Sequence, residues 1–241
     1  MRNCLNVRIQ NRLNNLESNA MKIISDIRLY KSSENDNHVG FASKSLNIAV
    51  RRIVMKLREQ KFSLGDFDHL YLNFTTCEQE GTVTLIDKVD RYHPWYRYCD
   101  IGVTHSNYDN LGNNDCIEYV YAKLKDVLLS QFSMEDGIEE IIETSLTEAK
   151  KGPEMLMYFK EKKSTRGTAT VYLRLLDNGK YLPLLCITDL DGNEIFRTNL
   201  PETLDLNIIG EIQLSNKKVT VKPRKNAFTK GLEPISFKLQ L

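Results

Sequence analysis

The chain has 241 residues, of which 41% are hydrophobic and 27% are charged, and this is the composition of an ordinary globular protein. Its length suits one large domain or two smaller ones that bury a core without disulfide or metal support. The 33 Lys and Arg residues almost balance the 32 Asp and Glu residues, so no molecule-wide field draws the chain to nucleic acid or to a membrane.

The cysteines and the hydropathy pattern predict a reduced protein of the cytoplasm. The cysteines are odd in number and include no C-x-x-C pair, which argues against a disulfide framework or a zinc ribbon. They are Cys4, Cys77, Cys99, Cys116 and Cys186. The first twenty residues lack the apolar run of a signal peptide, and no later run approaches the roughly 20 apolar residues of a membrane span.

Residues 1–20 are rich in asparagine and are expected to form a loose leader or a short amphipathic helix. The apolar residues at helical spacing are Leu5, Ile9, Leu13 and Leu16. Met21 follows directly and could equally be a translation start.

Residues 21–152 predict a mixed α/β domain with the element order β-α-β-β-β-α followed by a further helix. Alternating apolar and polar residues indicate strands over 21–30, 69–75, 82–86 and 98–103. Three-and-four spacing of apolar residues and capping residues indicate helices over 43–60, 115–132 and 133–152. The segment 106–115 is dense in turn formers and is expected to be a loop.

Residues 153–241 predict a second, antiparallel domain, so the whole chain is expected to be an α+β protein. The expected strands are 155–160, 168–176, 181–188, 194–197, 212–214, 219–222 and 235–239. Short turns such as Asn178-Gly179 and Asp191-Gly192 separate them, which favours hairpins over crossover units. Six basic residues and no acidic one lie between 212 and 232, either as protection of a sheet edge or as a partner-binding patch.

The segment from Asp87 to His105 holds the only tryptophan and a dense group of ring side chains. Protein interfaces favour Tyr, Trp and Arg as anchors, because each covers a large area and keeps one polar group. The predicted partner-binding residues are Arg91, Tyr92, Trp95, Tyr96 and Arg97. The alternative is that Trp95 belongs to the core beside a proline turn, and its exposure decides between the two.

Enzymatic signatures are missing, and we expect neither catalysis nor a cofactor. There is no glycine-rich phosphate loop, no G-x-S-x-G elbow and no H-E-x-x-H motif. The best candidates for a hydrolytic metal site are Asp87, Asp90, His93, Asp100, His105 and Asp109. The first three share a face only on a helix, which Pro94 disfavours. Cys99 is a further candidate nucleophile, although no partner lies at motif distance.

Nucleic-acid binding is a third possibility, since aromatic residues beside Arg91 and Arg97 could form a stacking platform in a basic groove. The near-zero net charge and the interleaved aspartates Asp87, Asp90 and Asp100 argue against it.

Residues 21–132 combine a strand, a cationic helix, the segment FDHLYLNFTT and the segment DRYHPWYRYCDIGV before a capped helix. In this order they resemble the immunity proteins of bacterial polymorphic toxin systems. The resemblance implies a small cytosolic α+β protein that binds and blocks a cognate toxin and is not an enzyme. It does not extend to residues 153–241, and it assigns no individual residue a role.

Overall fold

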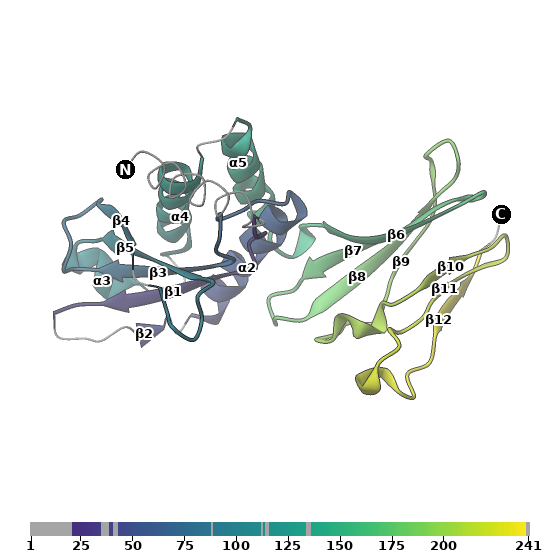
Figure 1. The fold of residues 1–241 in the computed structure, drawn as a ribbon. Helices are drawn as coiled ribbons and strands as arrows, with labels where there is room; N and C mark the ends of the chain where they lie inside the picture. The colour runs from purple at the N-terminus through teal and green to yellow at the C-terminus, as the bar shows by residue number, and fades with distance from the viewer. Residues whose placement is uncertain are drawn as a thin grey trace, which may run out of the picture. The chain divides into compact units, whose positions relative to one another are not determined.

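The computed structural model describes residues 21–34, 39–40, 43–87, 89–111, 113, 116–133 and 136–239. The leader expected over 1–20 lies outside the described residues. The chain divides between Thr147 and Glu148 into two compact units, here called unit 1 and unit 2 (Figure 1). The sequence predicts the domain boundary after Gly152, which is five residues later than the boundary in the structure.

Unit 1 is built on a five-stranded mixed sheet with the strand order β2-β1-β3-β5-β4 (Figure 1). The strands are β1 (Asp26–Ser32), β2 (Val39–Gly40), β3 (His69–Thr75), β4 (Val83–Ile86) and β5 (Tyr96–Gly102). The three central strands β1, β3 and β5 are parallel, while β2 and β4 pair antiparallel at the two edges.

Helix α2 (Lys44–Glu59) connects β1 to β3, as parallel neighbours require. Its start follows from Ser43, whose hydroxyl accepts a hydrogen bond from the Leu46 amide at 3.3 Å. The apolar stripe expected over 43–60 is buried in the core. Two of its cationic residues, Arg52 and Lys56, are buried as well, so fewer cations reach solvent than the helical periodicity suggested.

Three further helices follow β5, namely α3 (His105–Asn110), α4 (Ile117–Phe132) and α5 (Ile138–Ala149). The expectation of a loop over 106–115 is wrong for its first half, because α3 forms there. The Thr104 hydroxyl accepts the Asn107 amide at 3.1 Å and caps this short helix, which outweighs the turn-forming residues inside it. Asp115, at which the helix over 115–132 is expected to begin, lies outside the described residues.

One face of the unit 1 sheet forms the core. Its parallel register places Leu29 beside Leu72 and Cys99, all buried. The buried stripe of α4 includes Leu124 and Leu128 and joins this core. The two helices also touch, since the Tyr121 hydroxyl of α4 reaches the Ala49 carbonyl of α2 at 3.4 Å.

Unit 2 contains all seven strands that the sequence predicts, and every pairing between them is antiparallel. The strands are β6 (Met157–Ser164), β7 (Gly167–Leu175), β8 (Tyr181–Thr188), β9 (Glu194–Asn199), β10 (Ile212–Leu214), β11 (Lys218–Val221) and β12 (Ile235–Lys238). They form a four-stranded sheet, β6-β7-β8-β9, and a three-stranded sheet, β10-β11-β12 (Figure 1). The sheets meet through the rings of Phe196 and Phe237, whose centroids are 5.8 Å apart.

The predicted α+β class is confirmed, with a mixed first half and an antiparallel, strand-rich second half. No helix in the described part of the chain has the length and apolar character that crossing a bilayer demands.

Candidate functional site: an aromatic sheet face

The strand register of unit 1 gathers ring side chains on the face of the sheet opposite the core. Because β1, β3 and β5 are parallel, residues at matching positions lie in rows across them. The rows on this face are Asp26, His69 and Tyr96, then Arg28, Tyr71 and Tyr98, then Tyr30, Asn73 and Asp100. We call this surface, together with His93 and Trp95 beside it, the aromatic face.

The rings of the aromatic face contact one another in a continuous series. Tyr71 lies at its centre, with ring centroids 4.5 Å from Tyr96, 5.4 Å from Tyr98 and 5.6 Å from Tyr30. His93 stacks on Tyr96 at 4.7 Å with an interplanar angle of 18°. Such packing holds each ring in place before any ligand arrives, which lowers the entropic cost of binding.

The turn before β5 fixes the position of Trp95. The Asp90 carboxylate accepts hydrogen bonds from the amides of Tyr92 and His93 at 2.7 and 2.9 Å. The carbonyl of Trp95 accepts the amides of Asp68 and His69 at the start of β3, at 3.1 and 3.3 Å. These bonds join the turn to the sheet, so the indole ring extends the aromatic face at its edge.

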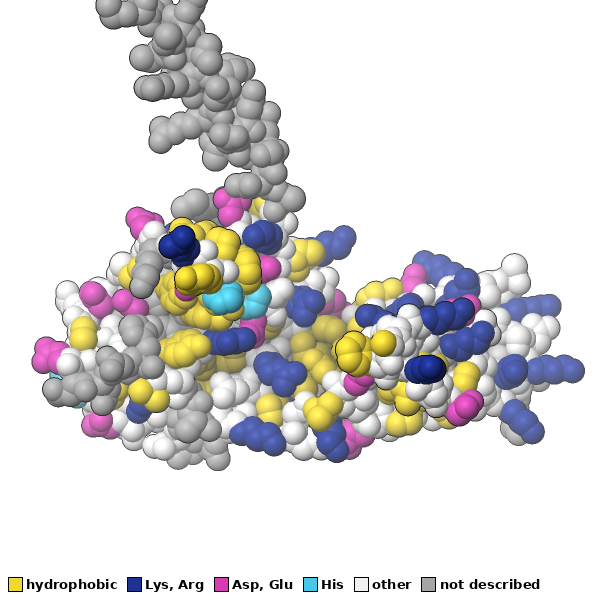
Figure 2. Space-filling model, turned by 60° about the horizontal axis from the view of Figure 1, so that its bottom comes forward, with side chains coloured by type: hydrophobic (Ala, Val, Ile, Leu, Met, Phe, Trp, Pro, Cys, Tyr) yellow, Lys and Arg dark blue, Asp and Glu magenta, His cyan; other side chains and the backbone are white. Residues whose placement is uncertain are grey.

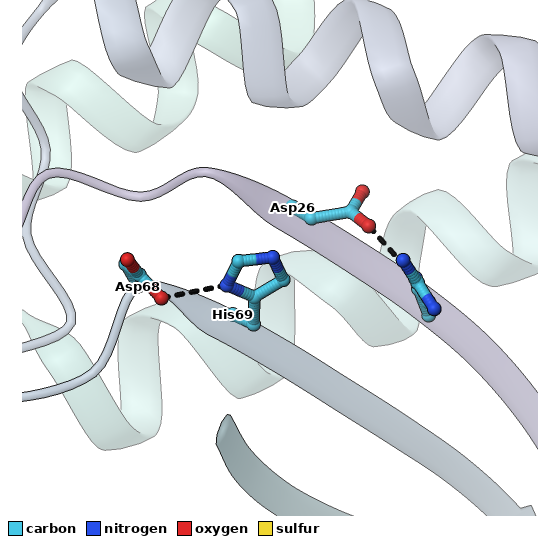
Figure 3. Close-up of polar contacts among 4 residues, drawn as sticks. Asp26, Asp68 and His69 are labelled. Atoms are coloured by element: carbon cyan, nitrogen blue, oxygen red, sulfur yellow. Dashed lines mark hydrogen bonds and ion pairs between the residues drawn. The ribbon is translucent and has the colours of Figure 1, made fainter. Parts of the chain in front are cut away.

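Two polar pairs lie in or next to the strands that carry the rings, and Figure 3 draws both pairs. Asp26 accepts a hydrogen bond from the Arg28 guanidinium at 2.8 Å, and Asp68 lies 2.6 Å from Nδ1 of His69. The hydrogen bond to Asp26 raises the pKa of Arg28 above its usual range. The same guanidinium lies over the Tyr71 ring, 5.5 Å from its centroid. The face thus already binds one guanidinium of its own between an aromatic ring and a carboxylate.

The packing of the rings changes the acidity of two tyrosines. Burial, followed by a hydrogen bond with Tyr96, raises the pKa of Tyr71. Burial also raises the pKa of Tyr98, with the nearby Asp90 charge acting in the same direction. Both hydroxyls therefore remain protonated donors throughout the physiological range.

The structure brings two of the five predicted partner-binding residues together on the aromatic face. Trp95 and Tyr96 are half-buried, with their ring centroids 5.8 Å apart. Arg91 and Tyr92 are exposed in the preceding turn, and Tyr92 is 79% exposed. The side chain of Arg97 projects from the opposite face of the sheet, as strand alternation requires.

On the opposite face of the sheet, the side chain of Arg97 contacts residues outside the aromatic face. Its guanidinium lies over the Phe67 ring at 4.9 Å from the centroid and 3.9 Å from the Asp87 carboxylate. Arg97 therefore belongs to a different surface from Tyr96, although the two are adjacent in sequence.

Sequence reasoning missed Tyr30, Tyr71, Tyr98 and His69 as members of the same surface. The available signal was the alternation in 69–75, where His69, Tyr71 and Asn73 occupy the positions between the apolar residues. These residues form one surface with those of β1 and β5 only because the three strands are parallel neighbours. A local sequence pattern does not predict which strands pair.

The candidate metal ligands do not converge. Within the described residues, no group of three or more His, Cys, Asp or Glu side chains is placed to hold a metal ion. Asp90 caps the turn, His93 stacks on Tyr96, and Asp100 accepts a hydrogen bond from Asn73 at 2.9 Å. Each of these side chains thus has a structural role that explains its presence.

Cys99 lies in the core strand β5 and is fully buried. Burial raises the pKa of its thiol to about 12. A thiol in this setting holds almost no thiolate at neutral pH, and thiolate is the nucleophilic form. The environment of Cys99 is therefore that of a structural core residue.

Figure 2 shows histidine side chains next to side chains of the hydrophobic class, which there includes Tyr and Trp. The ring centroids of His69 and His93 lie 5.1 and 4.7 Å from that of Tyr96. Comparison of the chain with protein-family models, with curated proteins and with solved structures finds no match.

Proposed function

We propose that the protein is a cytoplasmic binding protein and that the aromatic face of unit 1 is the surface that recognises its partner, another protein. The observation that carries this proposal is the set of pre-packed rings on the face of the sheet opposite the core. Exposed His93 and half-buried Trp95 contact the half-buried Tyr96, which packs in turn on the buried Tyr71. Rings of this kind cover a large contact area at little entropic cost and dominate the energetics of protein interfaces.

The charge of the aromatic face favours a partner that supplies a cation. Four carboxylates, those of Asp26, Asp68, Asp90 and Asp100, lie on or beside the rings, against two guanidinium groups, Arg28 within the rows and Arg91 in the turn. The contact of Arg28 with Tyr71 and Asp26 shows the chemistry that a partner's arginine would use. His69, Tyr96 and Asp68 offer the corresponding ring and carboxylate groups in the neighbouring row.

The same charges argue against nucleic acid on this surface. A stacking platform for bases works with a basic groove that neutralises the phosphate backbone. Here the carboxylates outnumber the cations, and the one guanidinium within the rows, that of Arg28, is already paired with Asp26. A phosphate chain on the aromatic face would meet net repulsion.

The resemblance of residues 21–132 to immunity proteins supports a more specific proposal, in which the partner is a cognate bacterial toxin and binding blocks it. Such an inhibitor requires a rigid recognition surface and no chemistry of its own. The structural roles of Asp90, His93 and Cys99 are compatible with a binding protein of this kind.

The proposal is tested by recovering the protein with its bound partner from the native host, identifying that partner by mass spectrometry and measuring its affinity for variants. Trp95→Ala should weaken binding by more than about 2 kcal/mol, or roughly 30-fold in Kd. The hydrogen bonds that hold the turn use the Trp95 backbone carbonyl, so the fold should persist. Circular dichroism and thermal unfolding check this.

Tyr158→Ala is the matched control, because Tyr158 is a partly exposed ring on β6 of unit 2. It should leave the affinity unchanged. Equal affinities of the wild-type protein and a folded Trp95→Ala variant would contradict the proposal, and so would the recovery of no stoichiometric protein partner.

A further inference from the structure

Unit 2 carries a local excess of positive charge that the totals of the chain conceal. From Glu148 to Leu241 there are 16 Lys and Arg residues against 11 Asp and Glu residues, a difference of +5. Figure 2 shows many Lys and Arg side chains on the side of unit 2 turned toward the viewer. The relevant question is whether these cations converge on one place.

Five of these Lys and Arg residues line a groove of about 430 Å³ that three separate segments of the chain form. Strand β6, the start of β10 and the residues after β11 each contribute cations or backbone to its walls. The charged residues of the lining are Lys160, Glu161, Lys162, Glu211, Lys222, Arg224 and Lys225. Five cations thus face two carboxylates.

Two backbone segments of the groove approach each other closely at Gly210. A Cβ atom on this residue would lie 2.5 Å from the backbone of Pro223 and Arg224. The Gly210 amide donates to the Lys222 carbonyl at 2.6 Å, and the Lys222 amide donates to the Glu211 carbonyl at 2.8 Å. Lys160 of β6 completes the floor by donating from Nζ to the Gly210 carbonyl.

The two carboxylates of the groove are already engaged. Glu161 lies 3.3 Å from Lys163, and Glu211 lies 3.7 Å from Lys222. The hydrogen bond from Gln213 and the charges of Lys222 and Lys225 lower the pKa of Glu211. For the described residues, no ion pair joins Lys162, Arg224 or Lys225 to a carboxylate, so their charge is available to a ligand.

We propose that this groove of unit 2 binds the phosphate groups of an oligophosphate anion. Phosphate concentrates more charge than a carboxylate and offers several acceptor oxygens, which suits adjacent lysines and an arginine fork. Lysines also protect exposed sheet edges, a role that needs their charge but not a shared hollow. Here cations from β6 and from the segment after β11 share one hollow, with Lys160 fixed at its floor.

The test is titration of the full chain with three probes: inorganic triphosphate, a single-stranded oligonucleotide and poly-glutamate of matched charge. The wild-type protein should bind a phosphate probe at near-physiological salt at least tenfold more tightly than poly-glutamate. Stronger binding of triphosphate would assign a free oligophosphate, and stronger binding of the oligonucleotide would assign a nucleic-acid backbone.

The double variant Lys162→Ala/Arg224→Ala should lose at least tenfold in affinity for the phosphate probe. Both side chains are exposed, so thermal unfolding should show an intact fold. The matched control is Lys180→Ala, a cation of unit 2 outside the groove that pairs with Glu202 at 3.2 Å. Absence of phosphate binding, equal binding of poly-glutamate, or equal losses in the double variant and the control would each overturn the proposal.

Discussion

At the scale of single residues, the aromatic face depends on where each side chain projects rather than on sequence proximity. Tyr96 and Arg97 are neighbours in the chain, yet one belongs to the aromatic face and the other packs over Phe67 on the opposite side of the sheet. Replacing Arg97 should therefore perturb the packing around Phe67 more than it perturbs recognition by the rings.

The central tyrosine of the face makes the stability of unit 1 sensitive to alkaline pH. The pKa of Tyr71 is raised in the folded state, whereas a tyrosine in the unfolded chain titrates near pH 10. As pH rises, the tyrosine of the unfolded chain loses its proton before the tyrosine of the folded protein does. The contribution of Tyr71 to the free energy of unfolding is therefore fully present below about pH 10 and decreases above it. Tyr71 alone contributes a slope of about 1.4 kcal/mol per pH unit in that window.

Urea unfolding at a series of alkaline pH values measures this slope. Tyr71→Phe should make it shallower, since phenylalanine has no proton to lose. Identical slopes for wild-type protein and Tyr71→Phe would show that the hydroxyl does not sense the folded environment.

The reactivity of each thiol should depend on how deeply its own side chain is buried. Cys99 has a pKa raised to about 12 and no exposure, whereas Cys77 is exposed. A thiol reagent should therefore label Cys77 in the native protein and reach Cys99 only after unfolding. Mass spectrometry of peptides from briefly labelled protein reports the order, and early labelling of Cys99 would contradict the buried assignment.

At the scale of elements, β5 and the turn before β4 approach too closely for any side chain at Gly102. A Cβ atom there would lie 1.8 Å from the Gln79 carbonyl oxygen. Gly102→Ala should therefore destabilise unit 1 by about 2 kcal/mol or more, as overpacking against backbone does. Gly40→Ala is the control, since no atom of the residues that the structure describes would lie within 4 Å of a Cβ at that position in β2. Chemical denaturation compares the two, and equal stabilities would contradict the close approach.

Most elements could be predicted because their signals are local. The stripe over 43–60 with its Ser43 cap specified α2, and alternation with short turns specified all seven strands of unit 2. The two-residue strand β2 has too little periodicity to detect. Helix α3 depends on the single cap at Thr104 inside a polar segment. The aromatic face was hidden for a different reason, because its rows depend on tertiary pairing of β1, β3 and β5.

At the scale of the whole molecule, the near-neutral total hides two units of opposite charge. Residues 1–147 contain 17 Lys and Arg against 21 Asp and Glu, a difference of −4, while residues 148–241 differ by +5. Composition predicts that any electrostatic effect is local. The imbalance of charge in fact extends over each whole unit. The proposed contact surface, with its carboxylates and rings, lies in the unit with the negative balance, and the proposed phosphate groove lies in the unit with the positive balance.

Side-chain footprinting of the free protein and of its complex tests most directly whether the aromatic face is the contact surface for a protein partner. Hydroxyl radicals modify exposed Trp, Tyr and His side chains, so protection on binding reports which rings become covered. We predict protection of His93, Trp95 and Tyr96 in the complex and unchanged modification of Tyr158. Unchanged modification of the three rings, with protection elsewhere on the chain, would contradict the account.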